Sequence, residues 1–181
     1  MSEFEILKYP DPFLRKKASR VERVDSSVRR LVEDMVETMR RAKGVGLAAT
    51  QVGVDKRVVV LDVPLIGVNE DICEELEERE RVLLKLINPE IVASGGEIEY
   101  EEGCLSLPGI TADVVRAAEV TIRALDADGR GFEMKAGGLP AIALQHEIDH
   151  LDGVLFIDRL SRLKRELLVR KYRKAMAAEA V

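Results

Sequence analysis

The stretch that most constrains the fold of this chain is residues 145–150, which read QHEIDH. In an α-helix, side chains four positions apart lie on one face, so the rings of His146 and His150 can reach one point. Pro140 as the first helical residue and Gly153 just past the last predict a helix over about residues 140–151. Glu147 would lie beside that face, close enough to take a proton from a water molecule on a metal ion. The spacing therefore predicts a metal site with a general base. The alternative is a surface helix that carries two histidines by chance, although these are the only two in the chain.

A catalytic site with two histidine ligands needs a third protein ligand. No histidine follows His150, and the downstream candidates are the carboxylates Asp152, Asp158 and Glu166. Asp152 is too close on the same helix to complete a tetrahedron, and Glu166 lies on a basic helix. These carboxylates stay open as alternatives, but an upstream ligand is more attractive.

Cys104, in the stretch EEGCLS (101–106), is the preferred third ligand. A thiolate needs positive charge or a metal nearby to be stable at neutral pH. The preceding Glu101 and Glu102 disfavour a free thiolate, so a metal-bound one is the better interpretation. The alternative is a buried structural cysteine, the commoner fate of a lone thiol. We expect the other cysteine, Cys73, to be incidental, because it lies in an acidic insertion, residues 69–82.

Apolar patterns elsewhere predict an α+β fold in one domain spanning residues 1–181. We expect mostly antiparallel sheets packed around the central metal-binding helix, with helices at the N- and C-terminal ends. The predicted elements are a helix over 26–42 capped by Asp25 or Ser26, strands over 58–63 and 82–89, the second ended by Pro89, a strand that runs into a Gly/Pro turn over 97–109, a hairpin over 120–136, and a final helix over 161–180 capped by Ser161.

Charge and apolar patterning limit the classes of function. The chain has no apolar run of the eighteen or so residues that a membrane span requires, and its N-terminal stretch resembles neither a signal peptide nor a transit peptide. We therefore expect a cytoplasmic protein without a membrane partner. A formal net charge of −5 argues against a dedicated DNA-binding protein. Two cysteines do not make a disulfide framework.

Three motifs together, GVGLAATQ (44–51), EEGCLS (101–106) and QHEIDH (145–150), resemble the signature motifs of peptide deformylases. These bacterial and organellar metalloenzymes remove the formyl group from the N-terminal N-formylmethionine of nascent polypeptides and release formate. The flanking stretches INPEI, LPG and HLDGVLFIDRLS, and the arm ILKYPDPFLRKKA, also resemble the family, so the resemblance covers essentially the whole chain.

The resemblance implies a set of site residues. It makes Cys104, His146 and His150 the ligands of one divalent metal, commonly Fe²⁺ in the cell, with Zn²⁺ or Ni²⁺ able to replace it. Glu147 would serve as general base and then general acid while hydroxide attacks the formyl carbon. The side-chain amide of Gln51 and the backbone N–H of Leu105 would stabilise the oxyanion, and the methionine pocket would be lined by Val45, Gly46 and Ile142.

Two other functions fit parts of this pattern. A metallopeptidase or other amidase would use the same HExxH chemistry, but the cysteine ligand argues against it. A non-catalytic metal or redox protein would want a fourth ligand in place of the spare carboxylate of Glu147. A smaller hypothesis pairs Asp149 with Arg116 beside the metal.

The final helix is strongly basic. The stretch from Arg159 to Lys174, which includes most of this helix, contains eight Lys or Arg residues against the single acid Glu166. One interpretation is a solvated helix face, and the other is a contact with ribosomal RNA, which would suit an enzyme that acts on nascent chains. We expect Leu163, Leu167, Leu168 and Tyr172 to form the apolar stripe that docks this helix.

Overall fold

The computed structural model describes residues 4–64 and 81–179. Within them lie three α-helices, α1 (Ser26–Arg41), α2 (Gly138–Leu151) and α3 (Arg162–Glu179). The strands are β1 (Gly46–Ala48), β2 (Val58–Pro64), β3 (Arg81–Gly95), β4 (Ile98–Cys104), β5 (Leu107–Arg116), β6 (Glu119–Leu125) and β7 (Gly131–Gly137). Short 3₁₀ helices include η1 (Pro12–Arg15), η2 (Ala49–Val52) and η4 (Phe156–Arg159). Cys73 and most of the predicted acidic insertion lie outside the described residues.

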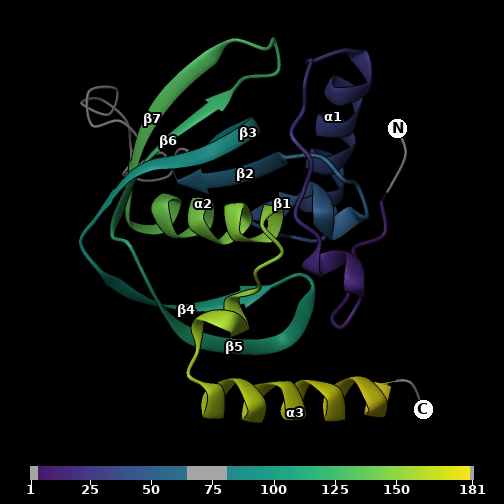
Figure 1. The fold of residues 1–181 in the computed structure, drawn as a ribbon. Coiled ribbons are helices and arrows are strands. Elements are labelled where there is room, and N and C mark those ends of the chain that lie inside the picture. The colour runs from purple at the N-terminus through teal and green to yellow at the C-terminus, as the bar shows by residue number, and fades with distance from the viewer. Residues whose placement is uncertain (1–3, 65–80, 180–181) are drawn as a thin grey trace.

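The strands form two antiparallel sheets that enclose α2. A five-stranded sheet has the order β1-β2-β3-β6-β7, and β4 pairs with β5 in a separate two-stranded sheet. Helix α2 lies between the larger sheet and the β4–β5 hairpin, whereas α1 and α3 lie at opposite ends of the molecule (Figure 1). The predicted α+β class, with antiparallel sheets around the HExxH helix, is confirmed.

The apolar run of β2 is buried on both faces. Successive side chains of a strand point to opposite faces, so Val59 and Leu61 pack in one core cluster and Val58 and Val60 in another. The first cluster contains Leu144 and other apolar residues of α2, and the second contains the apolar face of α1. The continuous run VVVLDV therefore places the larger sheet between the two helices, which holds α2 rigidly from one side.

The N-terminal helix and the 120–136 hairpin agree with the predictions. Asp25 caps α1, because its side chain accepts hydrogen bonds from the backbone N–H groups of Ser27 and Val28. Strands β6 and β7 pair across a turn in which Asp126 Oδ1 accepts hydrogen bonds from the N–H groups of Asp128 and Arg130.

The prediction that Pro89 ends a strand is wrong, because β3 continues through it to Gly95. The register with β6 shifts between Ile87 and Glu90, and a bulge is where a strand tolerates a proline that lacks a hydrogen-bond donor. Asn88 supplies the positive φ of 53° at this point. Its side-chain amide is buried and bonds the backbone N–H and C=O of Val21, each at 2.8 Å.

Two further predictions about prolines are wrong. The turn after Cys104 consists of Leu105 and Ser106, so Pro108 lies inside β5, on a two-stranded sheet where a missing donor costs little. Helix α2 begins at Gly138, which makes Pro140 its third residue. The first N–H groups of a helix have no intrahelical partner, so proline is tolerated there as well.

The C-terminal end of α2 agrees with the prediction. Gly153 has φ +74°, and its backbone N–H donates to His150 O at 3.1 Å. A Cβ at this position would lie 2.3 Å from the backbone oxygen of Arg15, so only glycine fits.

Ser161 caps α3, but the predicted docking stripe is partly wrong. Its Oγ accepts a hydrogen bond from the backbone N–H of Lys164, as expected of an N-cap. Leu163 and Leu167 are exposed, and the buried face consists instead of Leu168, Val169, Tyr172 and Met176. Tyr172 is 1% exposed, and its hydroxyl donates to Tyr9 O at 3.1 Å. Within 4–64 and 81–179, none of the helices is both long and apolar enough to cross a membrane.

Candidate metal centre

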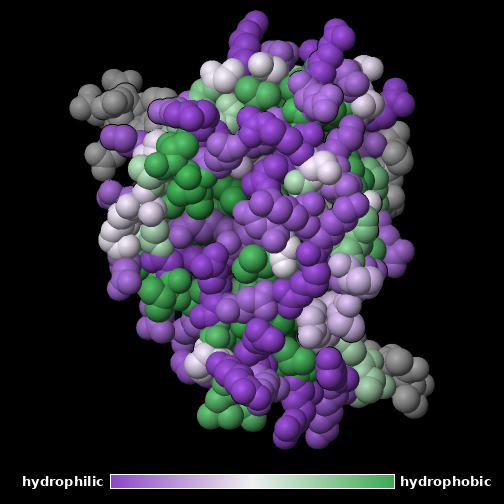
Figure 2. All heavy atoms as spheres, in the orientation of Figure 1, coloured by the Kyte–Doolittle hydropathy of each residue, from purple (hydrophilic) through white to green (hydrophobic). Residues whose placement is uncertain are grey.

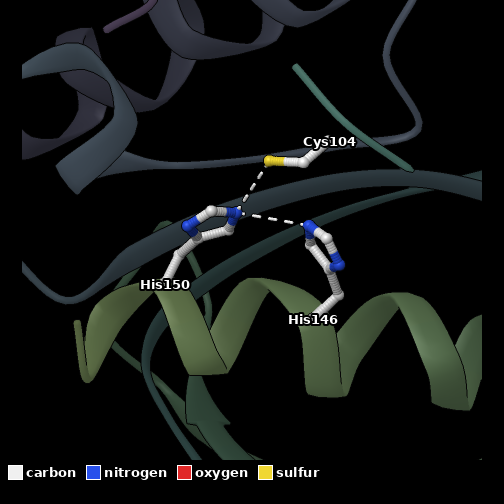
Figure 3. Close-up of side chains that lie close together, drawn as sticks. All are labelled: Cys104, His146 and His150. Atoms are coloured by element: carbon white, nitrogen blue, oxygen red, sulfur yellow. Dashed lines mark hydrogen bonds between the residues drawn. The ribbon is translucent and has the colours of Figure 1, made fainter. Parts of the chain in front are cut away.

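Cys104, His146 and His150 converge on one point. The histidines project from successive turns of α2, and Cys104 approaches them from the end of β4 (Figure 3). His150 Nε2 lies 3.2 Å from both Cys104 Sγ and His146 Nε2, and the three donor atoms lie within 4.8 Å of one another. Around a tetrahedral metal with ordinary bond lengths, neighbouring ligand atoms are about 3.3–3.6 Å apart. The donor set therefore fits a single thiolate- and imidazole-binding cation.

Glu102 fixes the ring of His146 from behind. Its Oε2 lies 2.8 Å from His146 Nδ1, which leaves Nε2 for the cation. The same carboxylate forms a bidentate pair with Arg116, at 2.7 and 2.9 Å, in which both side chains are 3% exposed. Burial alone would raise the pKa of Glu102, but the hydrogen bonds from Arg116 and His146 lower it to about 2. Glu102 is therefore a buried anion that orients His146.

Sequence reasoning missed this role of Glu102. It treated the residue only as an acid that disfavours a free thiolate beside it. A signal was present in the spacing, because residues two apart in a strand share a face, which puts Glu102 on the same side of β4 as Cys104. The partner of that carboxylate could not be found from spacing, because it depends on how α2 packs against the hairpin.

The predicted ion pair between Asp149 and Arg116 is confirmed. Arg116 Nη1 lies 2.6 Å from Asp149 Oδ2. Asp149 also accepts hydrogen bonds from Arg159, at 2.6 Å to Nη2 and 3.1 Å to Nε. A continuous line of charged contacts therefore runs from Arg159 to His146.

The two histidines experience different electrostatic surroundings. Burial alone would lower the pKa of His146, but its contacts with Cys104 and Glu102 hold that pKa well above the usual value. Burial, with the charge of His146 as the next cause, holds the pKa of His150 well below its usual value. The two rings therefore differ in the charge state that their surroundings favour.

Glu147 lies between the histidines in sequence and is 5% exposed. Its Oε2 is buried and finds no hydrogen-bond partner in the described part of the chain, and burial is the main reason that its pKa rises to about 7. The backbone of β1 lies against the other oxygen, because a Cβ on Gly46 would lie 2.5 Å from Glu147 Oε1. The carboxylate is thus held in place, with one oxygen left for a substrate or water.

Gln51 lies beside Cys104. Its Oε1 accepts a hydrogen bond from the backbone N–H of Ala48 at 2.9 Å, and this contact identifies the oxygen of the amide. Nε2 therefore faces Ser106 Oγ at 3.2 Å and Cys104 Sγ at 3.6 Å. The structure thus places a side-chain N–H donor beside the thiol.

The remaining predicted site residues are Leu105, Val45 and Ile142, which differ in how far they are exposed. Leu105 is in the turn after Cys104, and its carbonyl accepts a hydrogen bond from Lys8 Nζ at 2.6 Å. Val45 is 41% exposed next to Gly46, whereas Ile142 is 3% exposed on α2. Ile142 presents so little surface that its contact with a substrate stays a prediction.

Known proteins share this architecture. The chain matches the polypeptide deformylase family over residues 3–166. The chain belongs to that family. A peptide deformylase from Alkalilimnicola ehrlichii is 52% identical over 174 residues, which cover 96% of this chain and 91% of the relative. The crystal structure of a peptide deformylase from Legionella pneumophila has a TM-score of 0.84 and 46% identity, covering 99% of this chain and 98% of the other. One from Ehrlichia chaffeensis in complex with actinonin has a TM-score of 0.83 and 41% identity, covering 97% and 98%.

The resemblance predicted from the three motifs is confirmed. The chain is an enzyme of this hydrolase family, which removes the N-formyl group from nascent peptides. The roles of individual residues do not follow from the family match and rest on the geometry above.

Proposed function

We propose that this deformylase works with Cys104, His146 and His150 as ligands of one divalent metal and Glu147 as general base and acid, in a catalytic domain spanning residues 1–181. One observation carries the proposal: Glu147, next to His146 in α2, has a buried Oε2 that finds no partner among the described residues, and His146 belongs to a set of three donor atoms within 4.8 Å of one another. A buried carboxylate without a partner is costly unless a substrate or water completes it. The spare carboxylate argues against a purely structural metal site.

The metal supplies Lewis acidity when bound, which lowers the pKa of a water molecule and polarises the formyl oxygen. Glu147 Oε2 accepts a proton from the attacking water and then donates it to the leaving amine. A carboxyl group with a pKa of about 7 suits both transfers, because neither protonation state is strongly disfavoured near neutral pH. Contact with Gly46 keeps the carboxylate from rotating away between the two transfers.

Gln51 and Leu105 would stabilise the negative charge that develops on the formyl oxygen. The hydrogen bond from Ala48 to Gln51 Oε1 directs Nε2 toward the centre before any substrate arrives. Leu105 follows Cys104 directly in the turn between β4 and β5, which supports a role for its backbone N–H as the second donor. Donors that need no reorganisation are the effective ones in such sites. Val45, Gly46 and Ile142 would line the pocket for the methionine side chain.

The decisive assay is formate release from a formyl-methionyl peptide by the metal-loaded protein, beside the same peptide without the formyl group. We expect formate from the first and no cleavage of the second. Glu147→Gln should reduce kcat by about 10²–10⁴-fold while metal content stays stoichiometric. Glu101→Gln, an exposed acid on β4, is the control and should retain full activity. Cleavage of internal bonds would favour a metallopeptidase, and metal binding without hydrolysis would favour a structural site.

For the cofactor, we propose Fe²⁺ in the cell, with Zn²⁺ or Ni²⁺ able to replace it. A mixed thiolate and imidazole set suits all three cations. Metal analysis after strictly anaerobic purification tests the assignment, with iron expected at one equivalent. Stoichiometric zinc under the same conditions would contradict it.

We also propose that the enzyme is cytoplasmic and that α3 contacts the ribosome. Seven Lys or Arg residues of α3 are exposed, and the surface over this helix is mostly hydrophilic in Figure 2, with a hydrophobic patch near its start. Tyr172 ties the helix to the domain, so deletion would disturb the fold. Arg170→Glu with Lys174→Glu instead leaves this contact in place. We expect salt-sensitive cosedimentation with ribosomes that the double variant loses. Unchanged cosedimentation would support a solvated helix face.

A further inference from the structure

We propose that Arg159 is a positioning residue of the metal centre, which acts on His146 through three intervening charged side chains. The proposal rests on the proposed function, because it takes His146 to be a metal ligand. In the part of the chain that the structure describes, the Arg159 side chain pairs with Asp149 and with none of the metal donors, so we expect its influence to pass through Asp149, Arg116 and Glu102.

The line of contacts contains two bidentate Arg–carboxylate pairs. Arg159 donates hydrogen bonds to both oxygens of Asp149, at 2.6 and 3.1 Å. Arg116 donates to both oxygens of Glu102, at 2.7 and 2.9 Å. Arg116 joins the halves through Asp149 Oδ2 at 2.6 Å. Planar two-point contacts fix orientation as well as distance, unlike single contacts. The Arg116–Asp149 hydrogen bond joins the two pairs, so a displacement of Asp149 moves Arg116 and with it the carboxylate that bonds His146 Nδ1.

The backbone around Arg159 is itself anchored to the centre. Arg159 is the last residue of η4, and the ring of Phe156 at the start of the same helix stacks on His146 with centroids 6.2 Å apart and planes at 22°. Asp158 accepts a hydrogen bond from the backbone N–H of Leu155 at 2.8 Å and pairs with Arg15. The segment thus holds the His146 ring directly through Phe156 and indirectly through Arg159.

Exposure falls steeply along the line. The side chain of Arg159 is 47% exposed and that of Asp149 13%, whereas Arg116 and Glu102 are each 3% exposed. A pocket of about 320 Å³ opens beside the outer pair and is lined by Arg116, Gln145, Asp149 and Arg159 among others. Water screens the ion pair between Arg159 and Asp149. Loss of this pair should therefore lower the metal affinity by less than the about 10–100-fold that follows loss of a group bonded directly to a ligand.

The test compares Arg159→Ala and Arg159→Lys with Arg162→Ala. Arg162 lies three residues on, is 93% exposed and pairs with Glu166 one turn along α3, which makes it the matched control. Zn²⁺ affinity of the metal-free, full-length protein is measured by competition with a chelator. We expect Arg159→Ala to weaken binding about 3- to 10-fold, Arg159→Lys to lie between it and wild type, and Arg162→Ala to match wild type.

Two further readouts separate positioning from general support of the fold. Ethylguanidinium added to Arg159→Ala can enter the adjoining pocket and should restore part of the affinity. In formate release, kcat should fall while KM stays unchanged, because no candidate substrate-binding residue lines this pocket. If Arg159→Ala does not fold, the lysine variant carries the same comparison.

Equal Zn²⁺ affinities of the Arg159 and Arg162 variants would overturn the inference. A loss that neither ethylguanidinium nor lysine reduces would overturn it too, because that result indicates only a structural role. His146→Ala in the same titration separates failure of the ligand assignment from failure of the role proposed for Arg159. If that variant binds Zn²⁺ like wild type, the ligand assignment itself fails. If it loses Zn²⁺ while the Arg159 variants do not, the ligand set stands and only the role of Arg159 falls.

Discussion

Replacing Gly46 by alanine should impair catalysis without removing the metal. The added Cβ would lie 2.5 Å from Glu147 Oε1, 2.8 Å from its Cδ and 2.7 Å from Leu61 Cδ2. Carbon–oxygen contacts are rarely shorter than about 3.3 Å, so the Glu147 carboxylate must retreat by about 0.8 Å. Gly46 is held in register with Leu61 by the pairing of β1 with β2, which leaves the carboxylate as the part that moves.

The size of the effect follows from that displacement. A misplacement of about 1 Å at a reacting group costs about 10²-fold in rate, equivalent to about 2.7 kcal/mol in the activation free energy. Overpacking of this kind also lowers the free energy of unfolding by about 1–3 kcal/mol. We therefore expect kcat for deformylation to fall about 100-fold while the three donors still hold one metal ion.

The assay measures formate release, metal content and the thermal midpoint of unfolding for Gly46→Ala beside Gly95→Ala. A Cβ added at Gly95 would have no heavy atom within 4 Å other than those of Gly95 and its chain neighbours, so this control should behave like wild type. A Gly46→Ala enzyme with kcat within about twofold of wild type would refute the reasoning. That result would mean that the backbone of β1 moves in place of the Glu147 carboxylate, or that Glu147 does not transfer the proton.

Four other predictions follow from the structure and the proposed metal site. Glu102→Gln should weaken metal binding about 10–100-fold in a chelator competition, whereas Glu101→Gln should not. The pKa of Glu102 is lowered from 4.5 to about 2, so its stabilisation of the metal-free protein is present above about pH 4.5 and is lost as the pH falls toward 2. Urea unfolding should show this loss, of about 3 kcal/mol, and Glu102→Gln should abolish it. Asn88→Ala should lower the free energy of unfolding by about 2–3 kcal/mol. The substitution leaves the buried N–H and C=O of Val21 without hydrogen-bond partners and removes a residue suited to positive φ. An unchanged urea midpoint would contradict this. The Fe²⁺-loaded enzyme should lose activity in air through oxidation of the iron and then of Cys104, while the Ni²⁺-loaded enzyme keeps it; equal decay rates would count against the thiolate ligand.

Local periodicity was enough to predict several parts of the molecule. The four-residue spacing of His146 and His150 places both rings on one face of any helix, whatever that helix packs against. The apolar pattern of α1, its Asp25 cap and the turn between β6 and β7 likewise depend on neighbours a few residues away. Hydrogen bonds within a helix or a tight turn are set by adjacent residues, so these elements could be predicted from sequence alone.

Only the tertiary structure decided the strand registers and the contacts between segments that are distant in sequence. The bulge at Asn88 carries β3 through Pro89, and the turn after Cys104 comes earlier than its proline and glycine suggested. Such outcomes depend on strand register, which is set by pairing between distant segments. The bidentate ion pair between Glu102 and Arg116, and the contact of Gly46 with Glu147, likewise depend on how distant segments pack. Sequence spacing predicted the two histidine donors and the motif resemblance implied Cys104, but only the packing of α2 between two sheets showed which groups contact them.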